Sequence, residues 1–144
     1  MPMSRRVVAM FWATLALMSL ATTSCTSSHS GKLPFGAVDT VRSGSTLEGI
    51  VPVVGWAASE EGVQRVCLYV DRLLLTCTED VHGLRPDVAK VYPGVASAGS
   101  SGWKIQLDTT TISPGRHDLV VQAVSASGAT RDLVELAVTV APPQ

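Results

Sequence analysis

Short apolar runs separated by turn residues follow one another along the chain from Gly36 onward. The run from Trp103 to Thr109 alternates strictly between apolar and polar side chains, which is typical of a strand with one buried face. The run from His117 to Ala126 is apolar on both faces, so we expect it at the centre of a sheet. Helical periodicity over three turns is absent, and the pattern therefore predicts an all-β fold.

Two more apolar runs are expected to be strands. The run from Leu47 to Ala57 is interrupted by Pro52, which cannot donate to a strand ladder. We therefore expect two short strands there, with an edge or a bulge between them, followed by a turn at 59–62. The run 133–140 is expected to be the last strand, with alternate residues facing inward.

The hairpin from Val63 to Thr78 is the segment around which the predicted sheets are arranged. A three-residue loop at 71–73 places Cys67 opposite Cys77. Directly opposed Cα atoms lie roughly 4.5–5.5 Å apart, so we expect a disulfide in an exported protein. A two-residue turn would instead shift the register by one, place Cys77 opposite Val66 and leave two reduced cysteines.

The connection from Glu79 to Ser101 is too long for a hairpin turn, and long structured connections in compact domains are often functional. Asp87 follows Pro86, so we expect it to cap a single helical turn that Pro93-Gly94 ends. This connection is the candidate binding loop of the protein.

Four residues of this loop are the candidate binding residues: His82, Arg85, Asp87 and Tyr92. Arg85 has two interpretations. It either pairs with an acid such as Asp87 or Asp108 and pins the loop to the sheets, or it contacts a polar ligand. The first interpretation is favoured.

The pattern predicts about seven strands in roughly 105 residues, with turns about every eight to twelve residues. Two antiparallel sheets packed as a sandwich would bury one apolar face of each. Trp56 and Trp103 occupy inward-facing positions of the pattern, so we expect both in the core, whereas Tyr69 and Tyr92 are expected nearer the surface.

The first 24 residues predict an export signal. Arg5 and Arg6 precede an uncharged stretch from Val7 to Ala21. Fifteen helical residues span about 22 Å, less than the roughly 30 Å hydrocarbon core of a membrane, so a cleaved signal is favoured over a spanning anchor.

Cys25 follows small residues and resembles the site at which bacterial lipoproteins are cleaved and acylated. This resemblance implies a lipid, palmitate included, on Cys25 and a membrane anchor on the extracytoplasmic side. The alternative is ordinary cleavage near Ala21 or Ser24, which would release a secreted or periplasmic protein.

These predictions divide the chain into a signal peptide (1–24), a flexible Ser-, Gly- and Pro-rich tether (25–36) and one domain (37–141). Removing the signal takes away two of 11 basic residues and none of the 12 acidic ones, so the net charge becomes 9 − 12 = −3. Without a basic run, the mature chain has no surface suited to nucleic acid.

Several motifs, in this order along the chain, resemble those of a bacterial immunoglobulin-like domain. They are Gly55-Trp56-Ala57, Tyr69-Val70-Asp71, Arg85-Pro86-Asp87-Val88, Tyr92-Pro93, Ser101-Gly102-Trp103, Leu107-Asp108-Thr109-Thr110 and Pro114-Gly115-Arg116-His117. The resemblance implies an immunoglobulin-like β-sandwich in an extracytoplasmic setting, and it implies no catalytic residue. Such domains usually have Gly after the hairpin Asp, where this chain has Arg72; a positive φ there would cost Arg roughly 1 kcal/mol.

The residue types that carry catalysis or metal binding are scattered. His29, His82 and His117 have no metal-ligand spacing, so we expect neither a metal nor a cofactor. We predict a non-enzymatic lipoprotein of the cell envelope whose domain is a binding or adhesion module, with an envelope glycan or protein as its partner. The alternatives are an assembly subunit that docks through a strand edge near Pro52 and, more weakly, a small exported hydrolase, for which no base beside a nucleophile is visible.

Overall fold

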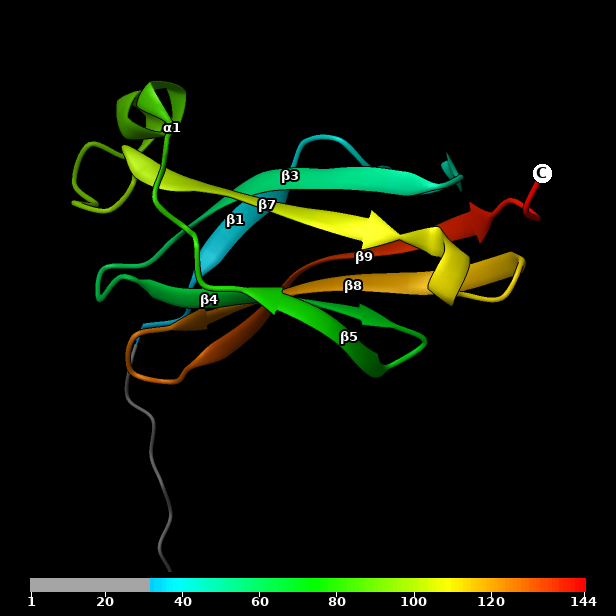
Figure 1. The fold of residues 1–144 in the computed structure, drawn as a ribbon. Coiled ribbons are helices and arrows are strands. Elements are labelled where there is room, and N and C mark those ends of the chain that lie inside the picture. The colour runs from blue at the N-terminus through cyan, green and yellow to red at the C-terminus, as the bar shows by residue number, and fades with distance from the viewer. Residues whose placement is uncertain (1–31) are drawn as a thin grey trace, which may run out of the picture.

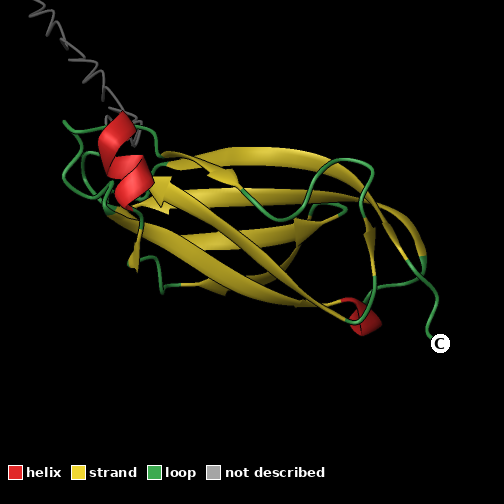
Figure 2. Ribbon diagram, turned by 90° about the horizontal axis from the view of Figure 1, so that it is seen from above, coloured by secondary structure: helices red, strands yellow, loops and turns green. Residues whose placement is uncertain are grey.

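The computed structural model describes residues 32–144 and arranges them in two β-sheets that pack face to face (Figures 1 and 2). In chain order the elements are β1 (Phe35–Val38), β2 (Thr46–Leu47), β3 (Ile50–Ala58), β4 (Val63–Val70), β5 (Leu73–Thr78), β6 (Gly83–Leu84), α1 (Pro86–Val91), β7 (Ser100–Asp108), the 3₁₀ turn η1 (Thr109–Thr111), β8 (Gly115–Ser125) and β9 (Thr130–Val140).

One sheet has the strand order β1-β3-β7-β6 and the other the order β2-β9-β8-β4-β5. Only the short pair of β2 with β9 is parallel among the described strands. The prediction of an all-β immunoglobulin-like sandwich is confirmed, and β8 is central as expected. The described residues form nine strands rather than the seven expected, because β1, β2 and β6 have only two to four residues each and are too short to show alternation.

The core lies between the two sheets and is made by alternate residues of the long strands. Val53, Leu107, Leu68, Leu119 and Val121 are at most 1% exposed. Burying each such side chain stabilises the fold by about 1.5–3 kcal/mol. The predicted inward face of β7 is confirmed, since its three large apolar residues are all buried.

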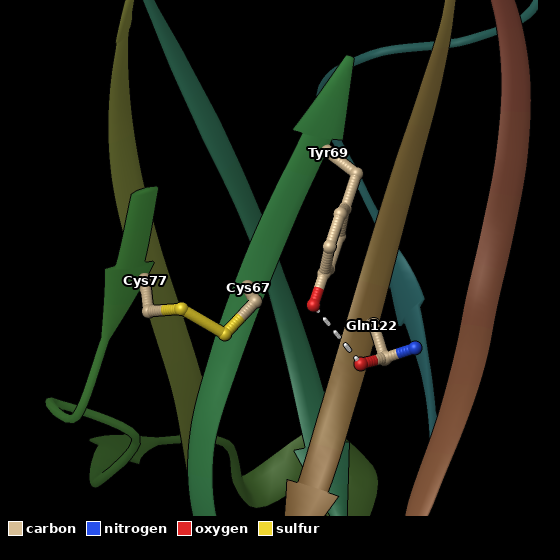
Figure 3. The surroundings of a disulfide bond; sticks show 4 residues. All are labelled: Cys67, Tyr69, Cys77 and Gln122. Carbon is tan, nitrogen blue, oxygen red and sulfur yellow. Dashed lines mark hydrogen bonds between the residues drawn. A yellow bond between two sulfur atoms is a disulfide. The ribbon is translucent and has the colours of Figure 1, made fainter. Parts of the chain in front are cut away.

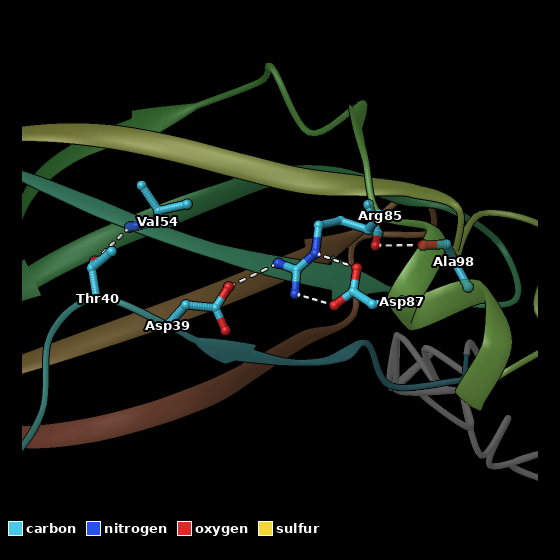
Figure 4. A network of polar contacts seen from close by, with 7 residues as sticks. Asp39, Thr40, Val54, Arg85, Asp87 and Ala98 are labelled. Carbon is cyan, nitrogen blue, oxygen red and sulfur yellow. Dashed lines mark hydrogen bonds and ion pairs between the residues drawn. The ribbon is translucent and has the colours of Figure 1, made fainter.

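The predicted break at Pro52 is wrong, because β3 runs unbroken through it between β1 and β7. The chain breaks instead at Gly49, whose φ is 64°. The carbonyl of Pro52 accepts from Thr40 Oγ1 (3.0 Å), and that oxygen accepts from the Val54 N–H (3.0 Å; Figure 4). Pro52 is tolerated because β1 has already ended on this side, so no ladder donor is needed there.

The N-terminal boundary of the domain differs slightly from the prediction. β1 begins at Phe35 and Pro34 is fully buried, so the last residues of the predicted tether (25–36) belong to the sandwich. The predicted signal peptide (1–24) and the predicted lipid site at Cys25 lie outside the described residues. Within residues 32–144, no helix is long and apolar enough to cross a membrane.

The β4–β5 hairpin turns through two residues, Asp71 and Arg72, rather than through the three expected. Both have positive φ (49° and 69°), as the mirror-image turns that join twisted strands require. A bulge then makes Leu75 an extra residue, because Leu74 is opposite Tyr69 and Thr76 is opposite Leu68. The bulge returns the ladder to the predicted register.

Cys67 therefore lies opposite Cys77, and the predicted disulfide is present, with Cα atoms 4.0 Å apart (Figure 3). The bridge is on the outer face of the five-stranded sheet beside Tyr69, whose hydroxyl donates to Gln122 Oε1 (3.4 Å). A disulfide of this kind fits an oxidising, extracytoplasmic compartment.

Candidate binding site

The connection after β5 crosses to the four-stranded sheet, forms β6 and then α1, and returns through a series of turns to β7 (Figure 1). The expected helical turn is present, with Pro86 at its first position, where a missing N–H costs nothing. Asp87 does not cap it, as had been expected: Arg85 occupies the capping position without a side-chain cap, and Asp87 lies inside the first turn. Pro93 follows the end of the helix, as predicted.

Arg85 is held by two carboxylates (Figure 4). Its Nε and one terminal nitrogen donate to the two carboxylate oxygens of Asp87 (2.9 and 2.7 Å), and the other terminal nitrogen donates to Asp39 Oδ2 (2.8 Å). The backbone N–H of Arg85 donates to the carbonyl of Gly99 (2.9 Å). The expected pair with Asp87 is confirmed, and the loop is pinned to the segment just after β1.

The electrostatics of this clamp follow from its geometry. The bidentate hydrogen bonds from Arg85 lower the pKa of Asp87 to about 2, and the same bonds raise the pKa of Arg85. The Arg85 side chain is only 20% exposed, whereas Asp87 and Asp39 remain open to solvent. Because the carboxylates are screened by water, the clamp orients the loop more than it stabilises the fold.

Asp108, the other acid considered for Arg85, has a different role. Its carboxylate accepts from the hydroxyl of Thr110 (2.6 Å) and from the Thr110 backbone N–H (3.0 Å). These bonds lower its pKa, with the hydroxyl contributing most, and cap the η1 turn.

Tyr92 belongs to a cluster of three aromatic side chains on the outer side of the four-stranded sheet. Its ring centroid lies 4.9 Å from that of Phe35 and 5.6 Å from that of Trp56, and the Phe35 and Trp56 centroids are 5.8 Å apart. Tyr92 is exposed and the other two are half-buried. We call these three residues the aromatic face.

The expectation that Trp56 packs in the core is wrong, whereas the same expectation for Trp103 is confirmed. Val53, Gly55 and Ala57 are buried, whereas Val54 and Trp56 between them are only half-buried. Side chains alternate along a strand, so Trp56 must point outward. The indole N–H of Trp103 is buried without a hydrogen-bond partner among the described residues.

The structure thus brings Arg85 and Asp87 together and joins Tyr92 to residues outside the candidate loop. His82 lies exposed between β5 and β6. The sequence did not predict a role for Phe35, the first residue of β1, or for Asp39, which directly follows β1. The only sequence signal for Phe35 was the short apolar run that begins there, and it fell within the predicted tether.

A second polar site, also missed, fastens the β4–β5 hairpin to β8. His117 Nδ1 lies 2.6 Å from Asp71 Oδ2, and Nε2 lies 2.7 Å from the carbonyl oxygen of Ser113. Both ring nitrogens face acceptors, so the site favours the imidazolium and raises the pKa of His117. The backbone N–H of Asp118, and then His117, lower the pKa of Asp71.

The described residues do not meet the requirements of a metal site. Among residues 32–144, no group of three or more His, Cys, Asp and Glu side chains is placed to hold a metal ion. The polar side chains described above are paired with one another, whereas Tyr92 of the aromatic face is exposed.

Two facing sheets with this strand order define a fibronectin type III or immunoglobulin-like β-sandwich. The chain is similar to an endo-β-1,4-mannanase from Thermotoga petrophila (TM-score 0.52, 14% identity, covering 77% of this chain and 20% of that one). It is also similar to fibronectin(III)-like modules of Clostridium thermocellum CbhA (TM-score 0.50, 12% identity, covering 76% of this chain and 99% of that one).

At these identities the likeness shows the fold alone, and the chain spans only a fifth of the mannanase chain. The sequence matches no protein-family model. It matches no curated protein either.

Proposed function

We propose that this protein is a non-catalytic binding module of the bacterial cell envelope and that the aromatic face binds its ligand, an envelope glycan. The observation that carries the proposal is the gathering of Phe35, Trp56 and Tyr92 on the outside of the four-stranded sheet. There they add nothing to the core between the sheets.

Aromatic rings at a surface suit ligands that have both an apolar face and a polar rim. Sugar rings have this character, because their C–H groups form faces and their hydroxyls lie at the edge. Tyr92 contributes a hydroxyl to such a surface. One of the similar solved structures is an endo-β-1,4-mannanase, so β-mannan is included beside an envelope glycan in the test below.

The helix-bearing loop would act by positioning. The Arg85 clamp ties the start of α1 to Asp39, and Tyr92 follows the end of the same helix. His82, Arg85 and Asp87 are therefore proposed to shape the edge of the binding site, with Tyr92 as the residue that contacts ligand.

The test is co-sedimentation of the exported chain with insoluble peptidoglycan sacculi and, separately, with insoluble β-mannan. Replacing a central contact residue in an interface commonly costs 2 kcal/mol or more, so we expect Trp56→Ala to weaken binding about 30-fold. Tyr69→Ala is the matched control, because Tyr69 is a half-buried aromatic residue on the other sheet. Equal binding by wild type and Trp56→Ala would disprove the assignment of the aromatic face.

We also propose that the module is exported and held at the membrane by a lipid on Cys25. The predicted signal, the tether and the disulfide support this setting. The intact mass of the membrane-extracted protein tests it, since acylation adds a diacylglyceryl and an acyl group to an N-terminal cysteine. An unmodified N-terminus would favour the secreted or periplasmic alternative.

A second candidate function is that of an assembly subunit that docks through a strand edge. The observation in its favour is β5, whose three leucines are exposed at the edge of the five-stranded sheet.

A further inference from the structure

β5 is the last strand of the five-stranded sheet and pairs on one side only, with β4 (Figure 1). Its sequence is LLLTCT, without charge or proline, although edge strands are usually protected by such residues. Leu73 is 74% exposed, Leu74 58% and Leu75 37%. An apolar, unprotected edge of this kind can pair with a strand of another chain.

The backbone of β5 is also prepared for pairing. Opposed residues that lie close together, as Cys67 and Cys77 do at 4.0 Å, form the pairs of an antiparallel ladder that exchange no hydrogen bonds. The N–H and C=O of Cys77 therefore point away from β4, toward the open edge. The disulfide ties β5 to the sheet, so little order has to be gained when another strand is added.

The charges at the two ends of β5 indicate which partner fits. Arg72 precedes the strand, and Glu79 and Asp80 follow it, all three exposed. The acid beside Arg72, Asp71, already has a partner in His117 Nδ1 (2.6 Å). If a second copy pairs antiparallel about a twofold axis near Thr76, Arg72 of one copy lies opposite the Glu79-Asp80 pair of the other. Symmetry makes this contact twice, once at each end of the shared ladder. Parallel pairing would set like charges against one another.

We propose that two copies of this chain associate through antiparallel pairing of their β5 strands, which joins two five-stranded sheets into one of ten strands. The exposed leucines of each copy are then covered by the other. The aromatic face is on the opposite sheet of each sandwich and stays open, so the dimer would present two copies of it. The inference does not depend on the ligand proposed above.

A ladder of six residues buries little area, and small interfaces are weak. We therefore expect a dissociation constant of about 10–100 μM. Sedimentation velocity of the exported chain, measured at concentrations from about 1 to 300 μM, should show a monomer–dimer equilibrium. A wild-type chain that stays monomeric at the highest concentration overturns the proposal, even if β5 then captures a strand of another envelope protein.

Two substitutions locate the interface. Leu75→Lys places a charge on the edge and should abolish dimerisation. Leu84→Lys is the matched control, because Leu84 is also an exposed leucine (83%, against 37% for Leu75) and lies on β6, an edge strand of the other sheet. Dimers that persist in Leu75→Lys, or that are lost in Leu84→Lys, would place the contact elsewhere and overturn the proposal.

A charge exchange tests the antiparallel arrangement. The variant Arg72→Glu makes both ends of β5 acidic, and the double variant Glu79→Arg with Asp80→Arg makes both ends basic. Each alone should dimerise at least about tenfold more weakly, because like charges directly opposite one another destabilise a strand pair. An equimolar mixture should recover dimers at wild-type concentrations. A mixture that stays monomeric, while both variants retain the disulfide and their circular dichroism, refutes the pairing.

Discussion

Removing the Cys67–Cys77 disulfide should lower the free energy of unfolding by an amount set by the loop that it closes. The two cysteines are separated by 10 residues, and the chain entropy that a loop of this length removes from the unfolded state is worth about 2.7 kcal/mol at 25 °C. The double replacement Cys67→Ala with Cys77→Ala removes this constraint. For a domain of about 110 residues, that loss corresponds to a fall of about 12 °C in Tm.

The assay is urea unfolding of the exported chain, followed by tryptophan fluorescence, because Trp103 is buried in the core. Wild type in reductant is the control for packing, since it loses the crosslink but keeps both sulfur atoms. Most of the effect should appear in this control. The Ala variant should be slightly less stable still, because Cys67 is 3% exposed and its sulfur fills part of the sheet surface.

Two results would refute the reasoning. A change below about 1 kcal/mol would mean that the unfolded chain is already ordered around the hairpin, so that the crosslink removes little entropy. Loss of the folded state on reduction would mean that the bridge holds β5 in place rather than merely restricting the unfolded chain.

Three further predictions concern other parts of the sandwich. Gly55→Ala should destabilise the fold by about 1–3 kcal/mol, because its Cβ would lie 2.1 Å from a carbonyl oxygen of β1, whereas Gly94→Ala, with open space around it, should be neutral in urea unfolding. Trp103→Phe should cost about 1–2 kcal/mol by the same assay, which is the cost of the cavity that the smaller ring leaves; the indole N–H that it removes is unpartnered, so its loss adds nothing. His117 has a raised pKa when folded, so stability should be full below about pH 6.5 and fall as pH rises through the raised value; in His117→Gln this decline should vanish. A decline that persists in His117→Gln would assign it to another group.

The sequence predicted those parts of the fold that depend on local periodicity. The inward face of β7 follows from its alternation of apolar and polar residues, and the central position of β8 follows from its continuous apolar run. Both patterns have the same meaning in any β-sheet. The disulfide was also predicted, although the turn was not. A turn shorter by one residue and a bulge at Leu75 offset each other, and the sequence alone does not locate a bulge inside a run of leucines.

The parts that could not be predicted depend on contacts between distant segments. Trp56 was expected in the core because its neighbours are apolar. Which alternate residues of β3 face the core, however, is decided by the contacts of β3 with the opposite sheet. Phe35 and Asp39 come to the candidate site only because β1 pairs with β3. A run of four residues does not by itself show that it will join a sheet.

Two glycines explain how β1 reaches that position. A Cβ on Gly36 would lie 2.1 Å from the carbonyl oxygen of Trp56, and one on Gly55 would lie 2.1 Å from that of Ala37. β1 and β3 therefore approach more closely than side chains at these positions would allow. This contact sets Phe35 against Trp56.

The same short strand also governs the other side of the candidate site. Asp39 directly follows β1 and holds Arg85, which places the start of α1, and Tyr92 at the end of α1 then closes on Phe35 and Trp56. The aromatic face is thus assembled from three segments that meet only if β1 is docked. Loss of β1 from the sheet would remove one aromatic residue directly and release a second, so ligand binding should be more sensitive to the packing of β1 than the stability of the core is.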